Sequence, residues 1–246
     1  MKNRALALGL SGLLFAGWAA PATAQFGGLV GKKSAAPAVD VDKALSAGSD
    51  LIGYITTAND LGMQGAGLML AMYPDDRFPE IRKMSAQYNE LSAKRKDGNL
   101  DAEQLKLSQS ASAAIAEELK GDAWKGYKKE NSANVGKAYG KLGLMVVADT
   151  LAGTLVKPTT DNLTAALEAV KKDPMKATQA GAIKSQLESL AAIAPALPKQ
   201  IESAGTVRSI CAKIAEAEKV KLPTDISADK IKDKATLVAA STALPE

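Results

Sequence analysis

Few residues in this chain could carry out catalysis, and the most useful type is missing. The 246 residues include no histidine and one cysteine, Cys211. Histidine is the usual general base near neutral pH and a frequent metal ligand, so Ser-His-Asp and Cys-His sites are excluded, as are zinc and di-iron sites that need histidine. One cysteine also leaves no Cys-x-x-Cys motif and no intramolecular disulfide. We therefore expect no metal and no other cofactor.

Cys211 itself has an ordinary explanation. Val207, Ile210 and Ile214 surround it at helical spacing, and free cysteine is among the residue types most often buried. We expect a buried thiol on the inner face of a helix. The alternative is an exposed thiol that reacts or pairs with another molecule.

One catalytic motif has a partial match. Ser227 and Lys230 fit Ser-x-x-Lys, the nucleophile motif of serine β-lactamases and penicillin-binding proteins. Those enzymes also need Ser-Asp-Asn and Lys-Thr-Gly, and neither tripeptide occurs here. Ser227 is more simply interpreted as the N-cap of a helix, with Lys230 exposed in its first turn.

The acidic residues do not form a recognisable site either. Asp40 and Asp42 lack the further ligands of a calcium-binding loop, and Asp75-Asp76 lies in a turn after Pro74. No Gly-x-x-x-x-Gly-Lys-Ser/Thr phosphate loop is present. An enzyme that works through carboxylates or lysines therefore has little support.

A short aromatic and basic stretch is the first candidate for an interaction surface. It comprises Trp124, Lys125, Tyr127, Lys128 and Lys129. Aromatic rings beside lysines can anchor a protein at a membrane interface. The alternative is a packed connector whose lysines are solvated.

Two apolar segments that contain or adjoin glycines are the second candidate. Residues 61–73 include Gly62, Gly65 and Gly67, and residues 142–156 include Gly143 and follow Gly136 and Gly140. Glycine costs a helix up to about 1 kcal/mol relative to alanine, so close helix–helix contact or a kink is expected at these positions. We expect both segments in the centre of the fold. The alternative is a surface or cavity for a lipid, an acyl chain or a partner helix.

The N-terminus has the three parts of a bacterial-type secretory signal peptide. Lys2 and Arg4 precede an uncharged apolar run over residues 5–20, Pro21 ends the run, and Ala22-Thr23-Ala24 is a small-x-small site. We expect cleavage after Ala24, Sec-type export, and a periplasmic or secreted protein. A retained membrane anchor is the alternative, but a spanning helix needs about 20 apolar residues.

The expected mature chain is nearly neutral. Cleavage removes Lys2 and Arg4 and no acidic residue, which lowers the formal net charge from +4 to +2. Nucleic-acid-binding proteins usually have a marked basic excess or stripe, so nucleic acid is not expected as a partner. Residues 25–38 contain three glycines and a proline and are predicted to be a flexible leader.

Beyond the leader the apolar residues recur with helical period, and no segment has the alternation of a strand. Prolines and capping residues predict helices over residues 40–73, 79–96, 101–120, 132–156, 161–172, 175–193, 199–219 and from 227 onward. Connections are short, and aromatic residues make up only 4% of the chain. We predict an all-α fold: a single-domain antiparallel bundle of seven to eight helices over residues 39–241, with a disordered tail at 242–246.

These observations favour an exported, non-enzymatic cell-envelope protein that acts by binding or scaffolding. Its partner would be a protein or lipid of the envelope, and no transmembrane segment is expected in the mature chain. A peripheral membrane or lipid-associated protein is the second hypothesis, and an enzyme is the third.

Overall fold

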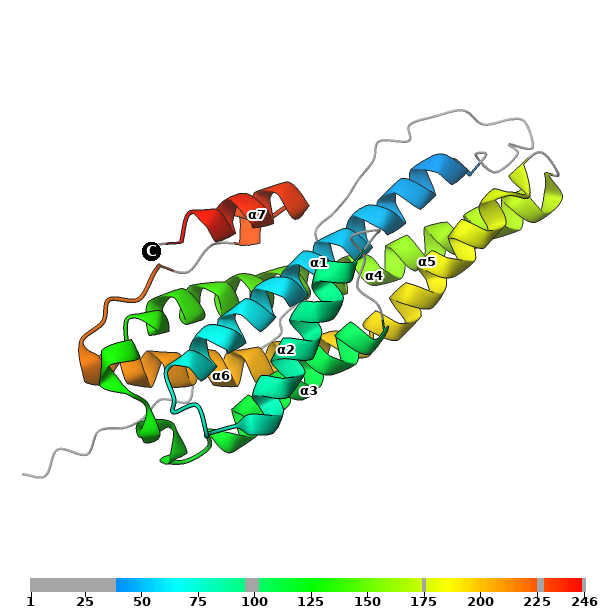
Figure 1. Ribbon diagram of the computed structural model, residues 1–246. Helices are drawn as coiled ribbons and strands as arrows, with labels where there is room; N and C mark the ends of the chain where they lie inside the picture. Colours follow the sequence, from blue (N-terminus) through cyan, green and yellow to red (C-terminus); the bar gives the residue numbers. More distant parts are fainter. Residues whose placement is uncertain (1–38, 96–101, 174–175, 225–227, 245–246) are drawn as a thin grey trace, which may run out of the picture. The chain divides into compact units, whose positions relative to one another are not determined.

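The computed structural model describes residues 39–95, 102–173, 176–224 and 228–244, and within these ranges the chain is all-helical with no strand (Figure 1). The predicted signal peptide (1–24), the predicted leader (25–38), the first residue of the helix predicted over 101–120 and the predicted N-cap Ser227 lie outside the described residues. The α-helices are α1 (Val41–Ala71), α2 (Pro79–Lys94), α3 (Ala102–Glu118), α4 (Asn134–Lys172), α5 (Gln179–Ile193), α6 (Leu197–Glu218) and α7 (Lys234–Thr242). The 3₁₀ turns that lie wholly within the described residues are η1 (Ala123–Gly126), η2 (Lys129–Asn131) and η4 (Ala228–Lys230).

The most extensive contact in the fold joins α1 and α4, which lie side by side in Figure 1. Glycines of α1 make it possible. A Cβ on Gly65 would lie 2.9 Å from Cγ of Leu142 and 3.3 Å from the carbonyl oxygen of Ala138, and one on Gly62 would overlap the sulfur of Met145. Close helix approach therefore explains two glycines of the 61–73 segment. It does not explain Gly67, which has open space beside it.

Pro158 does not divide α4, so the prediction of two helices over 132–156 and 161–172 was wrong. Proline removes one hydrogen bond, here to the carbonyl of Thr154. Both Pro158 and Thr154 are exposed, so water can solvate that carbonyl and the helix continues. The segment 142–156 was expected in the centre of the fold, but Leu155 within it is 46% exposed.

A buried polar layer joins α1, α3 and α6 inside the apolar core. The side-chain oxygen of Asn59 accepts hydrogen bonds from Oγ of Ser108 at 2.7 Å and from Nε2 of Gln200 at 2.6 Å. All three residues are fully buried or nearly so. Ser108, a polar residue on the buried face of α3, thus pairs with α1 and α6. Buried hydrogen bonds of this kind favour one arrangement of the helices.

The chain ends with a short helix that packs on α1 and α4. Asp233 caps α7: its carboxylate accepts from the backbone N–H of Thr236 at 2.8 Å, and the Thr236 hydroxyl accepts from the N–H of Asp233. Leu237 is fully buried and holds α7 in place. The disordered tail predicted at 242–246 does not begin at residue 242, since Thr242 belongs to α7 and Leu244 packs against the core.

Candidate functional site

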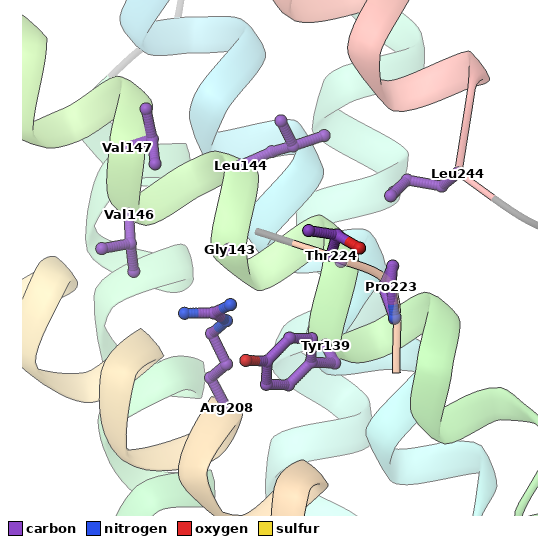
Figure 2. Close-up of a pocket in the computed structure, with 10 residues that line it drawn as sticks. Tyr139, Gly143, Leu144, Val146, Val147, Arg208, Pro223, Thr224 and Leu244 are labelled. Atoms are coloured by element: carbon purple, nitrogen blue, oxygen red, sulfur yellow. The ribbon is translucent and has the colours of Figure 1, made fainter. Parts of the chain in front are cut away.

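A cavity of about 200 Å³ lies between α4, α6 and the two segments that follow α6 and α7. Its aromatic ring comes from Tyr139 on α4 and its charged group from Arg208 on α6. The remaining walls are mostly apolar. They are formed by Gly140, Gly143, Leu144, Val146, Val147, Pro223, Thr224 and Leu244 (Figure 2).

Helical spacing on α4 creates one side of the cavity. Tyr139, Gly143, Val146 and Val147 recur at intervals of four, three and one, so they share a face. A Cβ on Gly143 would come within 3.1 Å of Nε of Arg208. The missing side chain therefore lets the arginine lie directly against the helix. The glycines of this segment stood out in the sequence, but nothing in the sequence marked Arg208 as the residue that packs against them.

Arg208 is the charged group of this cavity. Its guanidinium carbon lies 3.9 Å from the centroid of the Tyr139 ring, which places the cation over the aromatic face. Figure 2 shows the two side chains next to each other, with Val146 beside the guanidinium. Arg208 is half-buried. An arginine guanidinium presents a planar set of N–H donors that can bind carboxylates and other oxyanions.

A second glycine shapes the opposite wall. A Cβ on Gly140 would lie 2.6 Å from Cδ2 of Leu244 and 3.3 Å from Cγ of Pro223. The chain after α6 and the chain after α7 therefore both approach α4 at this glycine. Residues that the sequence assigned to a loop and a tail thus complete the cavity.

A wider hollow of about 800 Å³ adjoins the cavity and shares Pro223, Thr224 and Leu244 with it. It is lined by Leu222 and by Ala239, Ala240 and Ala243 of α7, together with Thr236 and two lysines, Lys221 and Lys230. The described residues that line the two spaces thus include three cations and no Asp or Glu. This balance favours a negatively charged ligand with an apolar part.

The predicted aromatic and basic stretch is brought together in the connector between α3 and α4. The rings of Trp124 and Tyr127 stack with centroids 6.4 Å apart, and both pack against the core. The Tyr127 hydroxyl donates to Glu218 of α6, a hydrogen bond that raises the tyrosine pKa to about 12.

The lysines of this stretch are solvated to different degrees. Lys125 pairs with Asp122 at 2.9 Å, and Lys129 is 4.0 Å from Glu218. The backbone N–H of Lys128 donates to the carbonyl of Met72 at 2.7 Å. This connector between α3 and α4 thus packs against α6 and the end of α1. Its use as an interaction surface stays a prediction.

Cys211 is fully buried on α6, with its sulfur 3.6 Å from that of Met69. Burial raises the thiol pKa to about 12. The thiolate is the nucleophilic form, so this cysteine is unreactive at neutral pH. The expected buried thiol is confirmed.

Asp149 was missed by the sequence reasoning and is the most unusual group in the core. It is fully buried on α4, and neither carboxyl oxygen has a hydrogen-bond partner among the described residues. Burial raises its pKa to about 8. Burial and the charge of Asp149 likewise raise the pKa of Tyr54 to about 12. In the sequence, Asp149 was distinguished only as an acidic residue within the apolar run 142–156.

Asp149 does not line the Arg208 cavity, so it is not placed to meet a ligand there. Among the described residues, no group of three or more acidic or cysteine side chains gathers as a metal site would require. Comparisons with protein-family models, with curated proteins and with solved structures found no match.

Proposed function

We propose that this chain is an exported, non-enzymatic binding protein whose ligand is a small anion with an apolar part. The supporting observation is the position of Arg208, which is half-buried with its guanidinium over the Tyr139 ring in a cavity whose other described lining residues are mostly apolar. Export rests on the signal peptide predicted at residues 1–24, with predicted cleavage after Ala24. The periplasm or the extracellular medium is the proposed location.

The proposed scaffold is an antiparallel helical bundle. Two contacts between α1 and α4 support this: Gly48 meets Leu163, while Gly65 meets Leu142 further along. Residue numbers thus rise on one helix as they fall on the other. A bundle of this kind builds ligand sites from side chains on facing helices.

The experiment compares hexanoate with hexylamine and 1-hexanol by isothermal titration calorimetry at pH 7.5. We expect hexanoate to bind most tightly, because only its head group complements the guanidinium. Arg208→Gln is expected to weaken hexanoate binding by about 10- to 100-fold, since a hydrogen bond to a charged group contributes about 1.5–3 kcal/mol. Arg208→Lys keeps the charge and is expected to lose less.

Lys213→Gln is the matched control, because Lys213 is an exposed cation on the same helix and does not line the cavity. We expect it to leave hexanoate binding unchanged. Equal affinity for the amine and the carboxylate, or an unchanged affinity in Arg208→Gln, would contradict the proposal.

A lipid-associated protein is the second candidate, and one observation favours it. Among the described helices, α4 is the one long and apolar enough to cross a membrane, and only 33% of its most apolar stretch is buried. A soluble core helix passes the same length and composition test, and Asp149 on α4 is costly to place in lipid. Sedimentation with phosphatidylglycerol vesicles would support this candidate, provided that Arg208→Gln sediments equally well.

A further inference from the structure

Helix α2 has little apolar surface buried against the rest of the fold. It packs on α3 and, at fewer points, on α1. Of its 16 residues, Ile81 and Tyr88 are buried, and Met84 is partly buried against the core. In proteins, most of the stability of a helix this short comes from packing on its neighbours. The position of α2 therefore depends strongly on the polar contacts near its two ends.

The first turn of α2 is fastened to the end of α1 by Arg82. Its Nη2 donates to the carbonyl oxygens of Leu70 at 2.7 Å and of Tyr73 at 3.1 Å. Its Nε donates to the carbonyl oxygen of Arg77 at 3.0 Å. The ring of Phe78, the residue before α2, packs edge-on against the ring of Tyr73 with centroids 5.2 Å apart. These contacts join α2 to the turn that leads into it, so they persist when the far end of the helix moves away.

The far end of α2 is fastened by one carboxylate of α1. Asp60 accepts a hydrogen bond from the Tyr88 hydroxyl at 2.6 Å. It accepts two more from the guanidinium of Arg95, the residue after α2, at 2.9 and 3.1 Å. Arg95 also donates to Gln104 of α3 at 3.3 Å. Tyr88 is 1% exposed and the Arg95 side chain 10% exposed, so the loss of Asp60 leaves nearly buried donors without this acceptor.

We propose that α2 is a lever, hinged at Arg82 and latched by Asp60, which opens while the other helices stay folded. Opening breaks three hydrogen bonds to a charged acceptor and leaves the contacts of Arg82 intact. It exposes Ile81, Met84 and Tyr88, which share one helix face at spacings of three and four residues. The latch thus controls when this apolar face is available for binding.

Hydrogen–deuterium exchange of the full chain, read by peptide mass spectrometry, measures the opening. Once released, α2 loses the packing that stabilises it, so its amides exchange. We expect the amides of residues 86–94 to exchange faster than those at the centres of α1 and α4, because local opening needs less free energy than unfolding of the bundle. Low urea concentrations are expected to change the α2 rate little, because local opening exposes little surface.

Two substitutions act on the latch. Asp60→Asn keeps the shape of the side chain and removes its charge, and we expect the α2 amides to exchange about 10- to 100-fold faster. Tyr88→Phe removes one of the three hydrogen bonds, and about a 3- to 10-fold increase is expected. Glu90→Gln is the matched control with no expected change, because Glu90 is exposed on α2 and pairs with Lys94 of the same helix.

A substitution away from α2 separates local from global opening. Leu163 is fully buried where α4 contacts Gly48 of α1. Leu163→Ala lowers the stability of the whole bundle, so the amides at the centres of α1 and α4 are expected to exchange about 30-fold faster or more. The α2 amides are expected to keep their rate, because the lever opens without disturbing Leu163.

Two results would overturn the proposal. If Leu163→Ala speeds the α2 amides by the same factor as those of α1 and α4, then α2 opens only when the whole bundle unfolds. If neither Asp60→Asn nor Tyr88→Phe changes the α2 rate, Asp60 is not the latch. Circular dichroism checks that each variant is folded, and Tyr88→Phe decides alone if Asp60→Asn is not.

Discussion

Replacing Asp149 with asparagine is expected to stabilise the protein by about 2 kcal/mol or more at pH 8. A carboxyl group whose pKa is raised from about 3.9 to about 8 must either keep its proton or place a bare charge in the core. Asparagine has nearly the same shape and carries no charge. Its buried amide lacks partners as well, at a cost of about 1–3 kcal/mol, so the gain is smaller than the full charge penalty.

The sign of the pH dependence follows from the direction of the shift. The unfolded chain releases this proton near pH 4, whereas the folded protein holds it to about pH 8. Between these values the unfolded state binds fewer protons, so stability falls as the pH rises, by up to about 1.4 kcal/mol per pH unit. The contribution of this group is largest below pH 4 and is lost by pH 8.

Urea denaturation at pH 4, 6 and 8 measures this prediction. We expect Asp149→Asn to be neutral or destabilising at pH 4 and stabilising at pH 8, a change of about 4 kcal/mol across the range. Asp161→Asn on the same helix is the control, because Asp161 is exposed and forms a surface ion pair with Lys157. A pH-independent effect of Asp149→Asn would show that the carboxyl is hydrated or paired in solution.

The second large effect is expected at the contact between α1 and α4. Gly65→Val would place two methyl groups where even a Cβ lies 2.9 Å from Leu142 and 3.3 Å from the backbone oxygen of Ala138. The leucine side chain can move, but the backbone cannot without separating the two helices. We expect a loss of about 3 kcal/mol or more in the free energy of unfolding.

Gly67→Ala is the matched control on the same helix. No atom outside its own helix turn lies within 4 Å of a Cβ at this position. Alanine is the better helix former by about 1 kcal/mol, so this substitution is expected to stabilise the protein. Both variants are compared by urea denaturation. A stable Gly65→Val protein would contradict the close packing of the two helices.

Much of the fold could be predicted from periodicity and helix-ending residues. The apolar stripe and following Pro74 gave α1 to within two residues at its end, and Pro79 marked the start of α2. Pro158 gave a wrong helix boundary because a proline ends a helix only when the hydrogen bond that it removes cannot be replaced. At an exposed position water can bind the freed carbonyl, and the sequence alone does not show which face of the helix is exposed.

The candidate site was much less predictable, because it depends on contacts between segments far apart in the chain. Gly140 and Gly143 indicated that something approaches α4. The approaching groups, Arg208 and Leu244, are separated from them by more than 60 residues and belong to no motif. Asp149 could have been noticed as an acid within an apolar run, but a surface position would have produced the same pattern.

The most direct test of the binding site is a crystal structure of the protein with 8-bromooctanoate, in which anomalous scattering locates the bromine. We predict the carboxylate within hydrogen-bond distance of the Arg208 guanidinium and the bromine inside the cavity. A carboxylate facing solvent with the bromine against Tyr139, or a cavity that stays empty at saturating ligand, would contradict the proposed site.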